Sequence, residues 1–344
     1  MIDAICIELM QKSTYLNTRE ISTIYFGGGT PSILNQIQLE KIFDALRNTY
    51  NVPEGIEITL ESNPEDISAS KLQSWSTAGI NRLSIGIQSF QDASLKWMNR
   101  NHSAEEAIQA VERAQAHGIS NISIDLIYGL PNLSAETWRS EIKKAVGLNI
   151  SHISTYCLTI EDKTVFGNML KKGKLPIVSD EVAEAHMLIL MEEMELNGFE
   201  QYEISNFCKP NYESQHNSSY WKGTPYIGIG PGAHSFDQKS RQYNVSNNAL
   251  YIKQMFNANE ETLVTIETLS ATDQYNEYIL TRLRTKWGIQ LSEIERLASH
   301  EYNTIQQQFV SLTNNNLLIL ENQTYRLSKK GKLLADEITL QLML

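Results

Sequence analysis

The chain has 344 residues, of which 41% are hydrophobic and 20% charged, a composition typical of a globular protein with one large domain and one smaller domain. Its formal net charge of -11 disfavours a nucleic-acid partner, because binding to phosphate backbones depends on Lys and Arg. The sequence has neither an apolar run of the ~18 residues that span a membrane nor a signal-peptide pattern, which predicts a cytoplasmic location.

Five short segments rich in Ile, Leu and Tyr predict strands that are buried on both faces. They cover residues 22–28, 56–61, 82–88, 121–129 and 152–160. The strand starts recur about every 25 to 40 residues, which is the period of a βα unit, and the segments between them carry no hairpin signal. We therefore expect an α/β fold, specifically a parallel (β/α)6-type partial barrel.

Helix ends are readable between these strands. Asn35 with Gln38 and Ser103 with Glu106 have the spacing of capping boxes, and Ser68 and Ser134 are further candidates for N-caps. Glycines follow three of the amphipathic stretches and predict left-handed helix ends at Gly79, Gly118 and Gly147.

The chain begins on a predicted helix, residues 2–10, whose apolar residues recur at helical spacing. A βα array that starts on a helix lacks its first strand, so we expect Met1 to be an internal or misassigned start. The pattern also predicts a helix over 179–198 that ends at Gly198, followed by a strand-like segment over 199–207. Residues 209–247 show no clear periodicity.

Beyond residue 250 the βα rhythm stops. The pattern predicts helices over 271–287 and 291–315, a hairpin over 317–328 and a last helix over 329–344. This order resembles a winged-helix unit and predicts two domains, 1–245 and 246–344. A nucleic-acid role for the second domain is disfavoured, because residues 282–344 carry eight Lys and Arg against six Asp and Glu.

Polar residues gather where the predicted strands end, which is where parallel α/β folds bind ligands. They are Gly27, Gly28, Gly29, Thr30, Glu61, Asn63, Gln88, Asp125, Tyr128, Tyr156 and Thr159. Each one alone could be a turn residue or a satisfied buried polar group. Together they suit an amino acid or a nucleoside, and Arg100 could clamp its carboxylate. A Rossmann site fits poorly, because Ser32 stands where the third glycine of that motif belongs.

The motifs GGGTP, ESNP, SIGIQSF followed by NR, and IDLIYGLP resemble those of radical S-adenosylmethionine proteins of the oxygen-independent coproporphyrinogen III oxidase group. The resemblance covers nearly the whole chain. It implies an S-adenosylmethionine site lined by Gly28, Gly29, Thr30, Glu61, Gln88, Arg100 and Asp125. The glycines would let the methionine part of that cofactor lie against main-chain donors.

The group has two branches. One decarboxylates propionates of coproporphyrinogen III by radical chemistry, and the HemW-like branch binds haem and hands it to apoproteins. Residues 216–221, HNSSYW, resemble the haem-binding motif of the chaperone branch. This implies haem or porphyrin as a partner, His216 as a haem-iron ligand, and Tyr220 and Trp221 as ring faces for the porphyrin. A loop histidine with two packed aromatics is the alternative, and His234 is a second candidate ligand.

The CxxxCxxC motif that binds the [4Fe-4S] cluster in this group does not occur in the chain. Its three cysteines, Cys6, Cys157 and Cys208, lie too far apart for a CxxC pair, a disulfide framework or that cluster. We therefore expect the cluster only in a longer form. At this point the function is a haem chaperone or, alternatively, a coproporphyrinogen oxidase, and enzymatic activity stays an open question.

Overall fold

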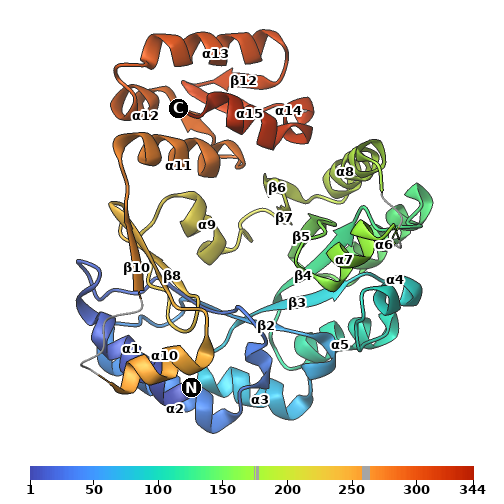
Figure 1. Cartoon of the computed structure of the whole chain (residues 1–344). Coiled ribbons are helices and arrows are strands. Elements are labelled where there is room, and N and C mark those ends of the chain that lie inside the picture. The colour runs from blue at the N-terminus through green and yellow to red at the C-terminus, as the bar shows by residue number, and fades with distance from the viewer. Residues whose placement is uncertain (174, 176–177, 258–263) are drawn as a thin grey trace. The chain divides into compact units, whose positions relative to one another are not determined.

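The computed structural model describes residues 1–173, 175, 178–257 and 264–344 (Figure 1). The chain forms two compact units, and neither follows one continuous stretch of sequence. Unit 1 contains Met1–Ile24, Leu34–Glu57 and Gln215–Leu344, whereas unit 2 contains Tyr25–Ile33 and Ile58–Ser214. The domain boundary near residue 245 stays a prediction. In the described residues, every helix is too short or too polar to cross a membrane.

A seven-stranded sheet forms the partial barrel, with the strand order β1-β2-β3-β4-β5-β7-β6 (Figure 1). Its strands are β1 (Thr23–Phe26), β2 (Glu57–Ser62), β3 (Arg82–Gln88), β4 (Asn121–Tyr128), β5 (His152–Cys157), β6 (Glu200–Glu203) and β7 (Asn206–Cys208). All five strands predicted from apolar runs are present. Strands β2 to β5 pair in parallel, which confirms the α/β prediction.

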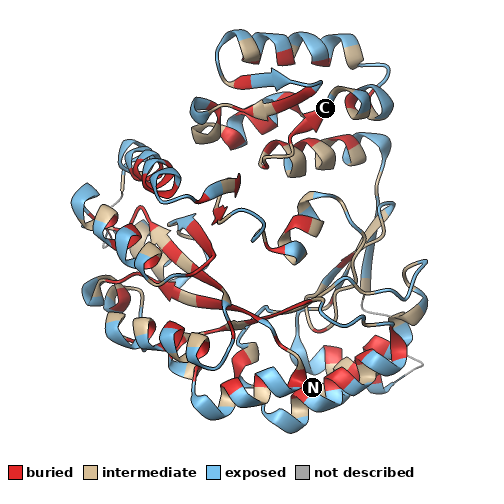
Figure 2. Cartoon of the chain, turned by 180° about the vertical axis from the view of Figure 1, so that it is seen from behind, coloured by how far each residue is buried: buried red, intermediate tan, exposed pale blue. Residues whose placement is uncertain are grey.

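Helices follow the parallel strands along the chain, as the βα period predicts. They are α2 (Gln36–Thr49), α3 (Ala69–Ala78), α4 (Asp92–Trp97), α5 (Ala104–Ala116), α6 (Ala135–Gly147), α7 (Val165–Lys171) and α8 (Asp180–Leu196). Trp75 on α3 and Trp138 on α6 are fully buried, and the Trp138 indole N–H donates to the carbonyl of His186 at 3.0 Å. Figure 2 shows buried residues along the strands and on one side of these helices. The core of unit 2 therefore lies between the sheet and its helices.

The predicted helix starts are confirmed, because each cap depends only on neighbouring residues. Asn35 and Ser103 form capping boxes, and the side chains of Ser68 and Ser134 accept from the backbone N–H three residues later.

The predicted left-handed helix ends are confirmed at Gly79 and Gly118, with φ of 103° and 86°. Gly198, where a helix was predicted to end, is also left-handed, with φ of 75°. The prediction for Gly147 is wrong, because this residue is the last of α6. Asn149 adopts the left-handed conformation instead, with φ of 54°. Asparagine tolerates this region better than other side chains do, so a glycine is not required there.

The strand-like segment predicted over 199–207 contains two strands, β6 and β7. These two strands pair antiparallel, and β7 pairs antiparallel with β5, with Ile153 opposite Phe207. Only Ile204 and Ser205 separate β6 from β7. The Ser205 N–H donates to the Glu203 carboxylate at 2.9 Å, so a local side-chain contact supports this turn. The residue pattern over 199–207 predicted a strand there but did not predict the reversal of chain direction between β6 and β7.

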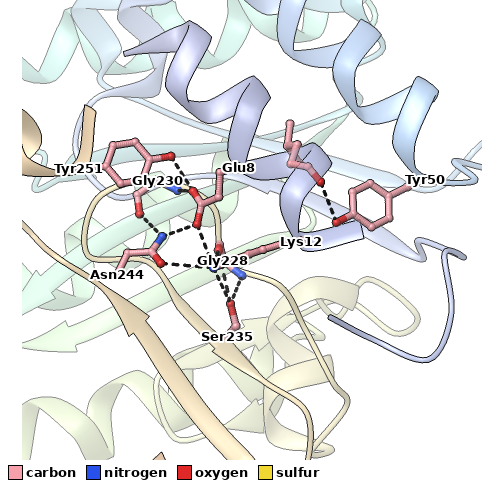
Figure 3. Close-up of polar contacts among 9 residues, drawn as sticks. Glu8, Lys12, Tyr50, Gly228, Gly230, Ser235, Asn244 and Tyr251 are labelled. Atoms are coloured by element: carbon pink, nitrogen blue, oxygen red, sulfur yellow. Dashed lines mark hydrogen bonds and ion pairs between the residues drawn. The ribbon is translucent and has the colours of Figure 1, made fainter. Parts of the chain in front are cut away.

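Unit 1 contains α1 (Ile2–Gln11), α9 (Gln215–Trp221), α10 (Asn248–Phe256) and a three-stranded sheet of β8 (His234–Phe236), β9 (Ser240–Asn244) and β10 (Val264–Thr268). The stretch 209–247 is therefore structured, although its elements are too short to produce a periodic pattern. The Glu8 carboxylate on α1 is buried and joins this stretch to the helix (Figure 3). It accepts from the Gly230 N–H, the Asn244 amide and the Tyr251 hydroxyl, and it pairs with Lys12.

The C-terminal part is mostly helical. It contains α11 (Ala271–Leu283), β11 (Ile289–Gln290), α12 (Leu291–Leu297), α13 (Tyr302–Asn314), β12 (Leu318–Glu321), β13 (Thr324–Leu327), α14 (Lys329–Leu333) and α15 (Ala335–Leu342). The predicted hairpin is confirmed as β12 and β13. The predictions of single helices over 291–315 and 329–344 are wrong, because the backbone leaves the helical region at Ala298 and Leu334.

Candidate functional site

The glycine run after β1 forms a turn whose residues are glycine for two different reasons. Gly28 and Gly29 have φ of 71° and 108°, a conformation that side chains disfavour, and added Cβ atoms there would meet nothing within 4 Å. At Gly27 an added Cβ would lie 2.5 Å from the Tyr25 ring and 2.9 Å from a Glu61 oxygen. Glycine is therefore required at 27 by space and at 28 and 29 by backbone conformation.

Glu61 on β2 ties this turn to the next strand. One carboxylate oxygen accepts from the Tyr25 hydroxyl at 2.7 Å, and the other accepts from the Gly28 N–H at 3.2 Å. The carbonyl of Thr30 accepts from the Ile33 N–H at 3.2 Å and closes the turn. One of the main-chain donors predicted for a ligand is therefore held by Glu61.

Gln88 ends β3 in an unusual conformation. Its φ is 70°, the strand register shifts between Ile85 and Gln88, and the side chain is largely buried. A Cβ at Gly86 would lie 2.8 Å from the Gln88 amide nitrogen and 3.9 Å from the Asn63 oxygen. The bare backbone at Gly86 therefore leaves room for the Gln88 amide. A left-handed residue at a strand end costs free energy and often marks a functional site.

Among the predicted site residues, Asp125 on β4 has the carboxyl group whose pKa is shifted most. Burial and the charge of Glu61 raise the pKa of Asp125 from 3.8 to about 7. A hydrogen bond with Ser154 and the charges of Arg82 and Arg100 oppose that rise. The charges of Glu61 and Arg100 therefore both act on Asp125, as expected of residues that share one site.

Arg82 and Ser154 were not predicted as site residues. Arg82 is 2% exposed on β3, and its charge acts on the pKa values of Tyr25, Asp125 and His152. An arginine that opens an otherwise apolar strand was the available signal, because such a charge is rarely buried without electrostatic partners.

Two of the predicted strand-end residues lie elsewhere. The Tyr128 ring packs against Trp138, with ring centroids 5.9 Å apart, and its hydroxyl contacts the Met187 sulfur at 3.6 Å. It belongs to the core. Thr159 is exposed and donates to the Cys157 carbonyl at 3.4 Å. Tyr156, in contrast, lies within range of the predicted site: burial and the charges of Asp125 and Glu61 raise its pKa.

Comparisons with known proteins agree with this geometry. Residues 7–145 match the Radical SAM superfamily, and residues 269–334 match the HemN C-terminal domain. The heme chaperone HemW of Lactococcus lactis is 33% identical over 98% of this chain and 88% of its own length. The heme chaperone HemW of Bacillus subtilis is 35% identical over 93% of this chain and 84% of its own. The chain belongs to the HemW family.

A solved structure shares the fold of this HemW-family chain. Coproporphyrinogen III oxidase (HemN) from Escherichia coli, a radical SAM enzyme, superposes with a TM-score of 0.83. The match covers 99% of this chain and 82% of the HemN chain, at 22% sequence identity. At that identity the likeness shows the fold alone.

In this HemW-family chain the HNSSYW motif forms helix α9, where a loop was the alternative. His216 and Tyr220 are four residues apart and lie on the same side of the helix. The His216 Nε2 and the Tyr220 hydroxyl are 2.9 Å apart, and the two rings meet edge to face at 5.0 Å. The Glu57 carboxylate accepts from the N–H groups of Gln215 and His216, at 3.0 and 2.9 Å, and holds the start of the helix.

The other nitrogen of His216 has a partner that was not predicted. Nδ1 lies 2.8 Å from the hydroxyl of Thr23 on β1. The indole N–H of Trp221 is buried, and no hydrogen-bond partner is found for it in the part of the chain that the structure describes. His234 begins β8, is exposed, and packs against Tyr243 on β9 with ring centroids 5.2 Å apart.

The cysteines of this chain do not fit a [4Fe-4S] cluster. Cys6 is buried on α1, Cys208 is buried in β7, and Cys157 is exposed at the end of β5. Across the described residues, no group of three or more His, Cys, Asp and Glu side chains could hold a metal ion.

A pocket of about 430 Å³ lies at the amino ends of β1 and β2, within unit 1. It is lined by Glu20, Ile21, Ser22, Pro53, Glu54, Gly55, Ile56 and Gln215. Two carboxylates on its wall disfavour the propionates of a porphyrin, because like charges repel. Its lining residues Ser22 and Gln215 are the chain neighbours of Thr23 and His216.

His102 fixes the position of the loop that contains Arg100 through two polar contacts. Its Nδ1 lies 3.1 Å from the Glu65 carboxylate, and its Nε2 lies 3.0 Å from the carbonyl of Ile87, next to Gln88. Replacing His102 by alanine should leave the buried carbonyl of Ile87 without its donor and remove the contact with Glu65, and it should cost about 1–3 kcal/mol of unfolding free energy. Urea denaturation measures this loss.

His117→Ala is the matched control for that change. The His117 ring is exposed and contacts only the Arg113 carbonyl at the end of α5 among the hydrogen bonds found for its ring, so its loss should change the stability little. Equal stability of the His102 and His117 variants would show that His102 does not hold the loop.

Proposed function

We propose that this chain is a haem chaperone of the HemW type, which binds haem at α9 and delivers it to apoproteins. The observation that carries the proposal is His216, whose Nδ1 is held by Thr23 while its Nε2 faces the hydroxyl of Tyr220. Histidines that bind a metal usually have their other ring nitrogen oriented by a hydrogen bond of this kind. The full-length relatives named heme chaperone HemW support the same function.

The residues around His216 fit a porphyrin. Tyr220 and Trp221 present aromatic rings, and Tyr220 packs edge to face on Tyr226 with ring centroids 4.6 Å apart. The chain of rings continues from Tyr226 to Phe236 at 6.0 Å. Flat apolar rings of this kind match the faces of a porphyrin, and the imidazole supplies an axial ligand for its iron.

We further propose that unit 2 binds S-adenosylmethionine. In this proposal the methionine part of the cofactor lies against the glycine turn of Gly28, Gly29 and Thr30, and the Glu61 carboxylate accepts from its ammonium group. Arg100 pairs with the carboxylate of the cofactor, and Gln88 and Asp125 bind its ribose hydroxyls. The coupling of Glu61, Arg100 and Asp125 in the pKa of Asp125 supports this arrangement. A cytoplasmic location and the haem-accepting apoprotein stay predictions.

Coproporphyrinogen oxidase is the second candidate function. The fold likeness to HemN is compatible with it, but the relatives with at least 30% identity over most of the chain include several named as haem chaperones. The chaperone function is therefore the better supported of the two.

Titration of haemin into the protein tests the haem site. The wild type should develop a shifted Soret band, and His216→Ala should bind about 10-fold or more weakly because the axial ligand is lost. His117→Ala and His234→Ala serve as controls that remove exposed imidazoles. Equal binding by the wild type and the His216 variant would exclude His216, and a loss confined to His234→Ala would transfer the ligand role to that residue.

A further inference from the structure

We propose that two residues outside the ligand itself control His216. Thr23 holds the imidazole in the tautomer whose Nε2 carries no proton, and the Tyr220 hydroxyl covers Nε2 until a haem iron displaces it. The inference rests on the proposed haem binding and adds how the ligand is prepared and protected before haem arrives.

The geometry of the His216 ring carries the argument. Both nitrogens face hydroxyl groups, the Thr23 hydroxyl at 2.8 Å and the Tyr220 hydroxyl at 2.9 Å. A neutral imidazole has one N–H donor and one acceptor, so one hydroxyl accepts from the ring and the other donates to it. The two hydroxyls therefore decide together which nitrogen keeps its lone pair.

The chemistry of the two hydroxyls selects the tautomer. A phenol is a stronger acid than an alcohol and therefore the better hydrogen-bond donor, so Tyr220 donates to Nε2 and the Nδ1–H donates to Thr23. Nε2 is then the nitrogen with a lone pair, the form that binds a metal.

The two partners differ in mobility. Thr23 is a short β-branched side chain on a strand of the central sheet, with a restricted rotamer. Tyr220 is 38% exposed near the end of a seven-residue helix, so its ring can turn toward solvent. An incoming iron therefore displaces Tyr220 and leaves the Thr23 contact in place. The hydrogen bond to Tyr220 competes with haem, and its removal should tighten binding.

Haemin titration of hydroxyl-deletion variants tests the inference. Tyr220→Phe keeps the ring and removes the competing hydrogen bond, so its Kd should fall about 3- to 10-fold. Tyr212→Phe deletes the hydroxyl of an exposed tyrosine that is not part of the proposed site and should bind as the wild type does. Thr23→Val should bind about 10-fold more weakly or worse, and Thr23→Ser should restore the affinity because it keeps the hydroxyl.

A second measurement does not depend on haem. Nitrogen-15 NMR of the His216 ring should show a protonated Nδ1 and an unprotonated Nε2 in the wild type and in Thr23→Ser, and a mixture of tautomers in Thr23→Val.

The two proposals fail in different ways. If the wild type shows no Soret change that depends on His216, the haem site is wrong, whatever the tautomer is. If haem binds through His216 but Tyr220→Phe binds equally or more weakly, Tyr220 does not cover the ligand. A protonated Nε2 in the wild type overturns the role given to Thr23, even if the Thr23→Val variant does not fold.

Discussion

Replacing Glu8 by alanine is expected to lower the free energy of unfolding by about 3–5 kcal/mol, because it leaves a largely buried ammonium group without its carboxylate. The Glu8 carboxylate pairs with Lys12 at 2.9 Å and accepts from the Tyr251 hydroxyl and the Asn244 amide, each at 2.6 Å (Figure 3). It also accepts from the Gly230 N–H at 2.7 Å. One substitution therefore removes an acceptor from four donors, of which Lys12 and the Asn244 amide keep other acceptors.

Urea denaturation of the wild type and the Glu8 variant measures this effect. Asp3→Ala is the matched control on the same helix, because Asp3 also pairs with a lysine, Lys41, but both side chains are more than half exposed. Solvent screens such a pair, so its loss should change stability little. Similar midpoints for the two variants would show that the buried network contributes nothing beyond a surface ion pair.

Replacing Asp125 by asparagine is expected to stabilise the protein at pH 8 relative to the wild type. The pKa of Asp125 rises from 3.8 to about 7 in the folded protein, mainly through burial and the charge of Glu61. Below pH 4 the carboxyl is protonated in both folded and unfolded states and carries no penalty. Between pH 4 and 7 the unfolded chain ionises first, so wild-type stability falls as the pH rises.

The penalty is complete above pH 7 and amounts to at most about 4 kcal/mol, which partial exposure reduces to about 1–3 kcal/mol. The gap between Asp125→Asn and the wild type should therefore widen between pH 4 and 8. Urea denaturation at pH 4, 6 and 8 measures it. Parallel stability curves across this range would refute the raised pKa.

Asp66 provides a control, because the opposite pH dependence of stability is expected for it. Burial opposes its ionisation, but hydrogen bonds from Lys71 and Ser32 and the charge of Lys71 lower its pKa overall. A lowered pKa stabilises the fold above the unfolded value and is lost as the pH falls. Asp66→Asn should accordingly destabilise the protein at pH 8 and lose that effect under acid conditions.

Asp125→Asn should also change the affinity of the proposed cofactor site. A carboxylate accepts hydrogen bonds from ribose hydroxyls better than a neutral carboxyl does, and it attracts the positive sulfonium. Asp125→Asn should therefore gain stability at pH 8 while it loses affinity for S-adenosylmethionine. Such opposed effects are common where a site holds a strained or buried charge.

The parts of the fold that the sequence predicted depend on short-range patterns. Apolar runs located β1 to β5, and the caps at Asn35 and Ser103 were found because each one is complete within four residues. The strand-end carboxylates Glu61 and Asp125 were candidates because the carboxyl ends of parallel strands share one edge. Their electrostatic coupling agrees with that reasoning, and their role as cofactor ligands stays a prediction.

The parts that the sequence missed depend on distant partners. Thr23 meets His216 across 193 positions, and Glu8 meets Tyr251 across 243. Neither threonine nor glutamate carries a local signal of such a contact. The β6–β7 hairpin was missed for a related reason, because its two-residue turn lacks glycine and proline and depends on pairing with β5.

The sequence by itself determined the alternation of strands and helices, the helix caps and the motif that places an imidazole beside two aromatic rings. These features follow from local periodicity and residue chemistry. Only the tertiary structure decided which hydroxyl orients each nitrogen of His216 and which donors surround Glu8. Such contacts depend on the path of the folded chain, which the pattern of neighbouring residues does not predict.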